Sequence, residues 1–248
     1  MRRRLSKEEN KYSRGTVVIA AGSINFPGAA LLTTGGARRG NAGYVKYLSG
    51  NAKLRELVIS NFPDVVPIRS MADQHCDAFV IGPGSPPITA IPRSIPVVLD
   101  SSAISILQRS AMRRQIAMPV VTPHEGELRY LGVKPENHLT HPERSSIAKE
   151  LARKFGAIVV LKGNRTVVAA PDGRIAIDEI GGPELATAGS GDVLAGLIGS
   201  MLVAAKLGIE PFDLICDAVE LHSRAGQYAA RQFTSVTAVE IMSSLAHV

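Results

Sequence analysis

The chain contains short runs of apolar, mostly β-branched residues that are separated by longer segments. The runs are residues 16–20, 78–81, 96–100, 117–122, 157–162 and 166–170. Most of them are apolar at consecutive positions, which is typical of strands buried on both faces of a sheet. Helix-like segments lie between the runs, at residues 29–39, 103–114, 125–131 and 142–155. Strands that alternate with helices predict a three-layer α/β fold around a mainly parallel sheet.

One pair of runs departs from this alternation. Residues 166–170 and 174–178 are joined by Pro171-Asp172-Gly173, a turn sequence, so they are predicted to form a β-hairpin. The far edge of the sheet is therefore expected to be antiparallel. From Gly189 onward the chain is expected to be almost all helical, with a break at residues 208–211. No repeat or linker is visible, which predicts a single domain over residues 1–248.

Composition argues against several classes of protein. Three arginines near the N-terminus supply half of the net charge of +6, only 4% of residues are aromatic, and there is no Trp. These features argue against a nucleic-acid-binding surface. The two cysteines lack CxxC spacing, which favours unpaired thiols and a reducing cytoplasm. Residues 193–205 are expected to be too short to span a bilayer and to form a buried helix, so no membrane association is expected.

Polar residues and glycines follow most of the predicted strands. They are Gly22-Ser23, Gly82-Pro83-Gly84, Asp100, Thr122 to Glu127, and Lys162-Gly163-Asn164. Because ligands of open α/β sheets bind beyond the carboxyl ends of the strands, this pattern predicts a site along one edge of the sheet.

The sequence Gly189-Ser190-Gly191-Asp192 precedes a long apolar helix. Glycines allow the backbone to turn with its N–H groups converging, and a helix N-terminus adds partial positive charge, so this turn suits a phosphate. Asp192 could take the proton from a substrate hydroxyl as its oxygen attacks phosphorus. The alternative is an ordinary helix start whose Asp only complements the helix dipole.

The segment from Thr187 to Gly196 resembles the signature of the ribokinase-like superfamily. More specifically, it is similar to the ADP- or ATP-dependent (S)-NAD(P)H-hydrate dehydratases, a carbohydrate-kinase-related family. Further segments follow in the order that the family shows. They are residues 11–15, Gly22-Ser23, 27–30, 40–43, 77–84, 97–100, 122–127, 159–163 and Leu221-His222.

The resemblance implies a ribokinase-like fold and two adjoining binding regions. The hydrated cofactor would contact Ala29, Gly84, His124 and Asp192. An adenine nucleotide would contact Lys162, Gly163, Asn164, Arg165, Thr166 and Gly191. Asp192 would be the catalytic base, and the backbone N–H groups of Gly189, Ser190 and Gly191 would donate hydrogen bonds to the transferring phosphoryl group. The implied reaction restores NADH or NADPH from the hydrate by phosphorylation and elimination of phosphate, with ADP or ATP as co-substrate and Mg²⁺ as cofactor. It also implies a homo-oligomer, by family habit a tetramer.

The sequence departs from the family in three ways. After Gly84 the chain continues as Ser85-Pro86-Pro87, which leaves little room for a crossover helix before Pro96. Asp100-Ser101-Ser102 replaces Asp-Ala-Asp and so removes one carboxylate. The epimerase domain of bifunctional relatives has no counterpart, so epimerisation is expected to come from elsewhere.

Several residues also have purely structural interpretations. His124 could bond its own backbone instead of a substrate, and Glu127 could hold a metal-bound water or cap the helix that follows. Lys162 could be a solvated strand end, and Asp100 is expected mainly to cap the next helix.

Two other functions compete with the dehydratase. One is a kinase of the same superfamily acting on a sugar or a hydroxymethylpyrimidine. The other is a nucleotide-binding protein without turnover.

Overall fold

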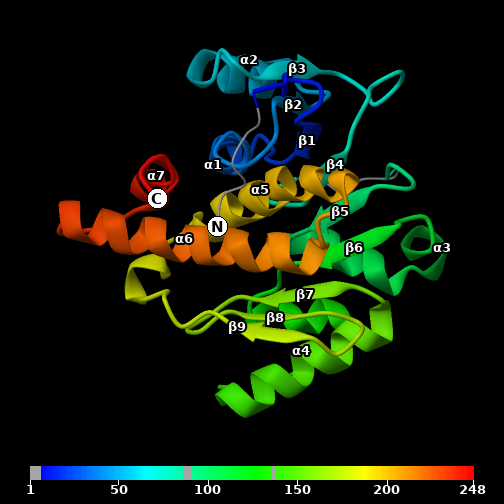
Figure 1. Cartoon of the computed structure of the whole chain (residues 1–248), viewed down its shortest axis with the longest axis vertical. Helices are drawn as coiled ribbons and strands as arrows, with labels where there is room; N and C mark the ends of the chain where they lie inside the picture. The colour runs from blue at the N-terminus through cyan, green and yellow to red at the C-terminus, as the bar shows by residue number, and fades with distance from the viewer. Residues whose placement is uncertain (1–6, 86–90, 136–137) are drawn as a thin grey trace.

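The computed structural model describes residues 7–85, 91–135 and 138–248. A nine-stranded sheet runs through it in the order β3-β2-β1-β4-β5-β6-β7-β8-β9 (Figure 1). The strands are β1 (Thr16–Ala20), β2 (Tyr44–Leu48), β3 (Val66–Ile68), β4 (Ala78–Ile81), β5 (Pro96–Leu99), β6 (Met118–Val121), β7 (Ile158–Leu161), β8 (Val167–Ala169) and β9 (Ile175–Ile177). Neighbours from β3 to β7 in this order are parallel, and β8 and β9 are antiparallel.

Helices cover both faces of the sheet. One hydrophobic cluster joins the sheet to the helices α1 (Pro27–Ala37), α2 (Ala52–Asn61), α5 (Ser190–Leu202), α6 (Pro211–Gln232) and α7 (Ala238–Ser244). A second cluster lies on the opposite face, under the 3-10 helices η1 (Ser101–Gln108) and η2 (Glu125–Leu131) and the helix α4 (His141–Phe155). Successive residues of the buried strands alternate between the two clusters, as Val17 and Val18 do. The predicted three-layer, mainly parallel α/β fold with an antiparallel edge hairpin is confirmed.

One edge of the sheet was not predicted from the sequence. The strands β2 and β3 and the helix α2 between them were not predicted. The strand β2 alternates buried and half-buried residues and contains Lys46, so it lacks the continuous apolar run of the central strands. The predicted helix 103–114 is also replaced, by η1 followed by the short helix α3 (Ser110–Arg113).

The helices α1 and α5 pack with their backbones in contact. A Cβ added to Gly36 would collide with the carbonyl of Val193, and one added to Gly196 would collide with the carbonyl of Thr33. Only glycine permits this approach. The contact fixes the N-terminus of α5, and with it the residues 189–192, beside the end of β1.

The helical segment Ser190–Leu207 is long and apolar enough to cross a membrane by length and composition. It extends beyond residues 193–205, the run that was expected to be too short to span a bilayer. The expectation of a buried helix is confirmed, because 72% of the segment is buried inside the protein, as in a core helix.

The sheet has a topological switch point between β1 and β4. The chain leaves β1 toward β2 and β3 on one side, and then returns to β4, which pairs with β1 on the other side. Such switch points open a crevice beyond the carboxyl ends of the strands. Of the short connection from β4 to β5, residues 82–85 and 91–95 contain no helix, and residues 86–90 lie outside the described part.

Candidate active site

The phosphate turn predicted at residues 189–192 is a helix start with glycine-specific geometry. Gly189 occupies the N-cap of α5 with a φ of 89°, in the left-handed region. A side chain there would also collide with Leu32. The amide of Ser190 donates to the Thr187 carbonyl over 3.2 Å, and the start of α5 borders a cavity of about 500 Å³ that includes residues 185–192 in its lining. We call it the turn cavity.

Asp192 lies in the first turn of α5 and lines two cavities. Burial raises the pKa of its carboxyl group to about 6, and the nearby carboxylates of Asp100 and Glu127 act in the same direction, while Lys162 opposes them. A carboxylate with this pKa is a stronger base than an ordinary Asp and is still ionised at pH 7.

Lys162 and Asp100 form a buried ion pair near Asp192. Lys162 Nζ donates to Asp100 Oδ1 over 2.7 Å, and Thr122 Oγ1 donates to the same oxygen over 2.5 Å. Burial by itself would lower the pKa of Lys162, but the carboxylates of Asp100 and Glu127 raise it. Lys162 is only 16% exposed, so the solvated alternative is wrong. The capping role predicted for Asp100 is also wrong, because its side chain makes no hydrogen bond to the amides of η1.

His124 and Glu127 form the capping box of η2. Glu127 Oε2 accepts from the His124 amide over 3.0 Å, and His124 Nδ1 accepts from the Gly126 amide over 3.0 Å. Both structural interpretations therefore hold. The outer nitrogen of the exposed His124 ring, Nε2, lies 3.6 Å from Glu127 Oε2, and both residues line the turn cavity.

A second cavity, of about 370 Å³, lies between Thr166 and Asp178, which flank the hairpin β8–β9, and residues of α5 and the middle of α6. We call it the hairpin cavity. Its lining includes Lys162, Gly163, Asn164, Thr166 and Gly191. Arg165 is not in that lining. It has a φ of 56° and forms an ion pair with Glu179 over 3.8 Å.

The floor of the hairpin cavity contains a buried histidine. His222 Nε2 lies 3.1 Å from the Ser190 carbonyl and 3.2 Å from its hydroxyl. Burial lowers the pKa of His222 to about 4, so its imidazole is neutral at pH 7 and Nε2–H can donate to the carbonyl. In the sequence, His222 belongs to a segment that matches the family pattern, but no role was predicted for it. In the structure, His222 holds Ser190, the first residue of α5.

The third cavity, of about 530 Å³, opens at the switch point of the sheet. We call it the switch-point cavity. The helix α1 supplies Ala29, the loop after β4 supplies Gly84, and α5 supplies Asp192. These three residues, predicted to contact the hydrated cofactor, are thus brought together. His124 lies in the turn cavity, on the other side of Asp192 and Glu127, which line both.

Arg144 connects two of the predicted segments, and sequence reasoning missed it. It is buried in α4, and its guanidinium donates to the carbonyls of Leu161 and Lys162 over 2.9 and 3.1 Å and pairs with Glu125. A Cβ on Gly163 would meet this guanidinium at 2.8 Å. Arg144 therefore holds the end of β7 against the start of η2. Because Arg144 lies within an ordinary amphipathic helix, nothing in the sequence distinguishes it from a surface arginine.

We expect Arg144→Met to lower the free energy of unfolding by about 2–4 kcal/mol, because two backbone carbonyls lose their hydrogen-bond donor. The loss should be smaller than for a fully buried ion pair, because the side chain of Glu125 is 30% exposed. Urea denaturation measures this effect. Arg153→Met, at an exposed position of the same helix, should change stability little. Equal stabilities of the two variants would contradict the role of Arg144.

Comparison with known proteins identifies the family. The model of the family described as NAD(P)H-hydrate dehydratase matches residues 17–247. This chain belongs to that family.

Individual relatives of the NAD(P)H-hydrate dehydratase family agree with the match. The chain is 34% identical to an ADP-dependent (S)-NAD(P)H-hydrate dehydratase of Neisseria meningitidis, over 89% of this chain and 79% of the relative. It is 33% identical to the bifunctional NAD(P)H-hydrate repair enzyme Nnr of Mycobacterium leprae, over 90% of this chain but 47% of the relative. The chain thus spans about half the length of the bifunctional relatives.

Solved structures show the same family and fold. An ADP/ATP-dependent NAD(P)H-hydrate dehydratase of Bacillus subtilis, crystallised with ATP and Mg²⁺, superposes with a TM-score of 0.82 at 29% identity, over 97% of this chain and 92% of that one. A ribokinase-like superfamily protein of Enterococcus faecalis has a TM-score of 0.81 at 24% identity, over 98% and 89% of the two chains. The predicted ribokinase-like fold is therefore confirmed.

Proposed function

We propose that this chain restores NADH and NADPH from the S form of their hydrates, at the expense of ADP or ATP. One observation carries the proposal within the family. The carboxylate of Asp192 lies in the wall shared by the switch-point cavity and the turn cavity, where an organic hydroxyl and a phosphate can meet. The two binding regions that the sequence predicts are adjacent at this residue.

The reaction requires a better leaving group than hydroxide. Asp192 accepts the proton of the hydrate hydroxyl, and the oxygen forms a bond to the terminal phosphorus while the bond from phosphorus to the bridging oxygen breaks. The products are a phosphate ester and the shortened nucleotide. The ring carbon–oxygen bond then breaks, phosphate leaves with the electron pair, and a proton leaves the neighbouring carbon to form the double bond.

The remaining site residues bind the nucleotide in this proposal. The amides of residues 189–191 and the ammonium of Lys162 face the transferring phosphoryl group. Gly163, Asn164 and Thr166 line the hairpin cavity, which would hold the rest of the nucleotide. Arg165 lies outside that lining, and its contact would require the side chain to leave Glu179.

The donor set suits Mg²⁺ in its usual nucleotide-bound form. Among the residues that the structure describes, no group of three or more His, Cys, Asp and Glu side chains could hold a metal ion. Mg²⁺ usually takes one or two carboxylates together with substrate phosphates and waters. Glu127, 10% exposed and facing the turn cavity, is the proposed carboxylate, directly or through a water. The ion would neutralise charge on the phosphate oxygens.

The deciding experiment is incubation of the protein with NADH hydrate and Mg²⁺, with ADP and ATP in parallel. Recovery of absorbance at 340 nm, accompanied by AMP from ADP or ADP from ATP, supports the proposal. No recovery from the hydrate, together with a stable phosphate ester in a parallel incubation with a sugar or hydroxymethylpyrimidine, would establish the kinase alternative. Nucleotide binding without any product would establish the non-catalytic alternative.

We expect kcat/KM for the hydrate to decline below about pH 6. Asp192 acts as a base only when ionised, and burial together with Asp100 raises its pKa to about 6 in the free enzyme. The rate should therefore be constant above that pH and fall about tenfold for each pH unit below it. A profile of initial rates between pH 4.5 and 8.5, with hydrate and nucleotide both well below their KM values, measures this. A profile that stays flat down to pH 4.5 would contradict the raised pKa.

We also propose that the chain acts as one folded unit in the cytoplasm. The half-buried, unpaired thiols of Cys76 and Cys216 support a reducing compartment. The predicted tetramer is tested by light scattering of the purified protein.

A further inference from the structure

The switch-point cavity differs in charge from the other two. Among the described residues, its lining contains the carboxylates of Asp192 and Glu127 but no Lys, Arg or His. The turn cavity also contains carboxylates, those of Asp100, Glu127 and Asp192, and the hairpin cavity contains Asp178, but both include the ammonium of Lys162. Phosphates are therefore repelled from the switch-point cavity, whereas each neighbouring cavity offers them one ammonium. The group that enters it must be uncharged or cationic.

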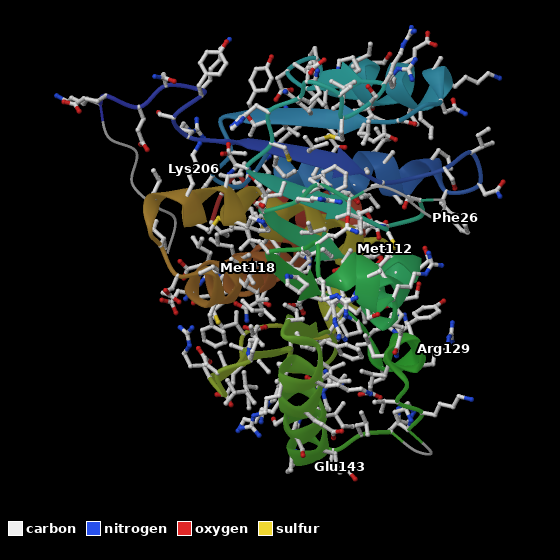
Figure 2. All side chains as sticks on the ribbon, turned by 90° about the vertical axis from the view of Figure 1, so that its right-hand side faces the viewer. Phe26, Met112, Met118, Arg129, Glu143 and Lys206 are labelled. Atoms are coloured by element: carbon white, nitrogen blue, oxygen red, sulfur yellow. The ribbon has the colours of Figure 1, made fainter. Side chains whose placement is uncertain are left out.

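The cavity also has a flat apolar surface at its mouth. Phe26 lines it and is 63% exposed, in a chain with only 4% aromatic residues. Figure 2 shows Phe26 at the margin of the molecule, on the side opposite Lys206. An exposed phenyl ring beside a cavity offers a stacking surface at no cost in burial.

The backbone of Phe26 is held in place although its ring is exposed. The Phe26 amide donates to the Ser23 carbonyl over 3.1 Å, and Phe26 is the N-cap residue of α1. A Cβ on Gly84 would meet Phe26 Cβ at 2.8 Å, so the loop after β4 presses directly against it. The ring therefore extends from a fixed point of the cavity rim.

We propose that Phe26 is the platform on which the hydrated nicotinamide ring stacks, so that its hydroxyl reaches Asp192. The inference rests on the proposed function and extends it to a residue that binds one end of the substrate. The hydrated ring is uncharged, as the cavity requires, and its ring carbons can lie against the phenyl group. The hydroxyls of Ser23, Ser101 and Ser102 in the same lining offer partners for its carboxamide.

The platform predicts a selective kinetic effect. Phe26→Ala should raise KM for the hydrate about tenfold, which corresponds to about 1.4 kcal/mol, and leave KM for the nucleotide unchanged. Phe26→Tyr and Phe26→Trp should restore the wild-type KM because they retain a ring. A variant that merely perturbed the fold would change both KM values and would not be rescued by other aromatic residues.

The absence of Trp from the sequence supplies a second readout. In Phe26→Trp the new indole is the only one, and binding of NADPH, the product, should strongly quench its emission. Tyr12→Trp is the matched control. Tyr12 is 67% exposed, and its carbonyl accepts from Lys206 Nζ, so it lies at the opposite edge of the molecule and should be quenched weakly or not at all.

The two measurements separate the possible failures. Equal hydrate KM values for wild type and Phe26→Ala, or equal quenching of Phe26→Trp and Tyr12→Trp, would overturn the proposal that Phe26 binds the ring. If the wild type still turns over the hydrate, the proposed function is retained. Absence of turnover by the wild type would overturn the proposed function, and the quenching experiment would still decide whether the nicotinamide end binds at Phe26.

Discussion

Asp192→Asn is expected to lower kcat for hydrate dehydration by about 10³-fold, within the range of about 10²–10⁴ for loss of a general base. The amide has nearly the same shape as the carboxylate but cannot accept the hydroxyl proton at neutral pH. The nucleotide should still bind, because the amides of residues 189–191 and the ammonium of Lys162 are unchanged. Single-turnover kinetics, with nucleotide affinity from calorimetry, measure the two effects separately.

The same substitution should not destabilise the protein. In the folded state the pKa of Asp192 is about 6, above its ordinary value. Ionisation of this carboxyl group therefore opposes folding, and its contribution to the stability of the protein is lost as pH rises through about 6. Asp192→Asn removes this pH dependence, and its Tm at pH 7 should equal or exceed that of wild type. Asp213→Asn, in the first turn of α6 and exposed, should leave kcat unchanged. Wild-type turnover in Asp192→Asn would exclude this residue as the base.

The sequence was informative where a local pattern determines structure. The central strands are buried on both faces, so their apolar runs are continuous and their ends are easily found. The residues that follow such strands must lie at one edge of the sheet, and Ala29, Gly84 and Asp192 do line one cavity there. Gly189 carries a signal because its left-handed backbone and the nearby Leu32 require glycine, and Gly191 carries a weaker one because a Cβ there would press on the end of Lys162.

The sequence was silent where the structure depends on distant partners. Asp100 looks like a helix cap in sequence, but its side chain bonds Lys162 and Thr122, 62 and 22 residues away. Arg144 binds carbonyls beyond the next strand, and nothing in its own helix marks it. Phe26 precedes the Pro27-Gly28 start of α1 and looks like an ordinary loop residue in sequence, because its position beside the switch-point cavity depends on the β4 loop as well.

Gly191→Val is expected to reduce kcat/KM at least about 100-fold, the scale for loss of one preorganised donor. A Cβ at Gly191 would lie 3.1 Å from Lys162 Nζ and 3.6 Å from its Cδ. Alanine would displace only the flexible end of that lysine, so Gly191→Ala should lose about tenfold or less. The additional methyl groups of valine would force Nζ away from Asp100 and also fill the space that the turn and hairpin cavities share at this residue.

The graded pair of variants at Gly191 tests whether the contact with Lys162 matters for function. If the glycine only relieved helix strain, Val and Ala would both be tolerated, because φ at residue 191 is not in the left-handed region. If Gly191 makes room for Lys162, the loss of activity must rise steeply with the size of the side chain at residue 191, and the affinity for the nucleotide must fall as well. Gly50→Val is the control, since a Cβ there meets nothing within 4 Å. Equal activity of Gly191→Val and Gly50→Val would show that the ammonium of Lys162 needs no fixed position to transfer the phosphoryl group.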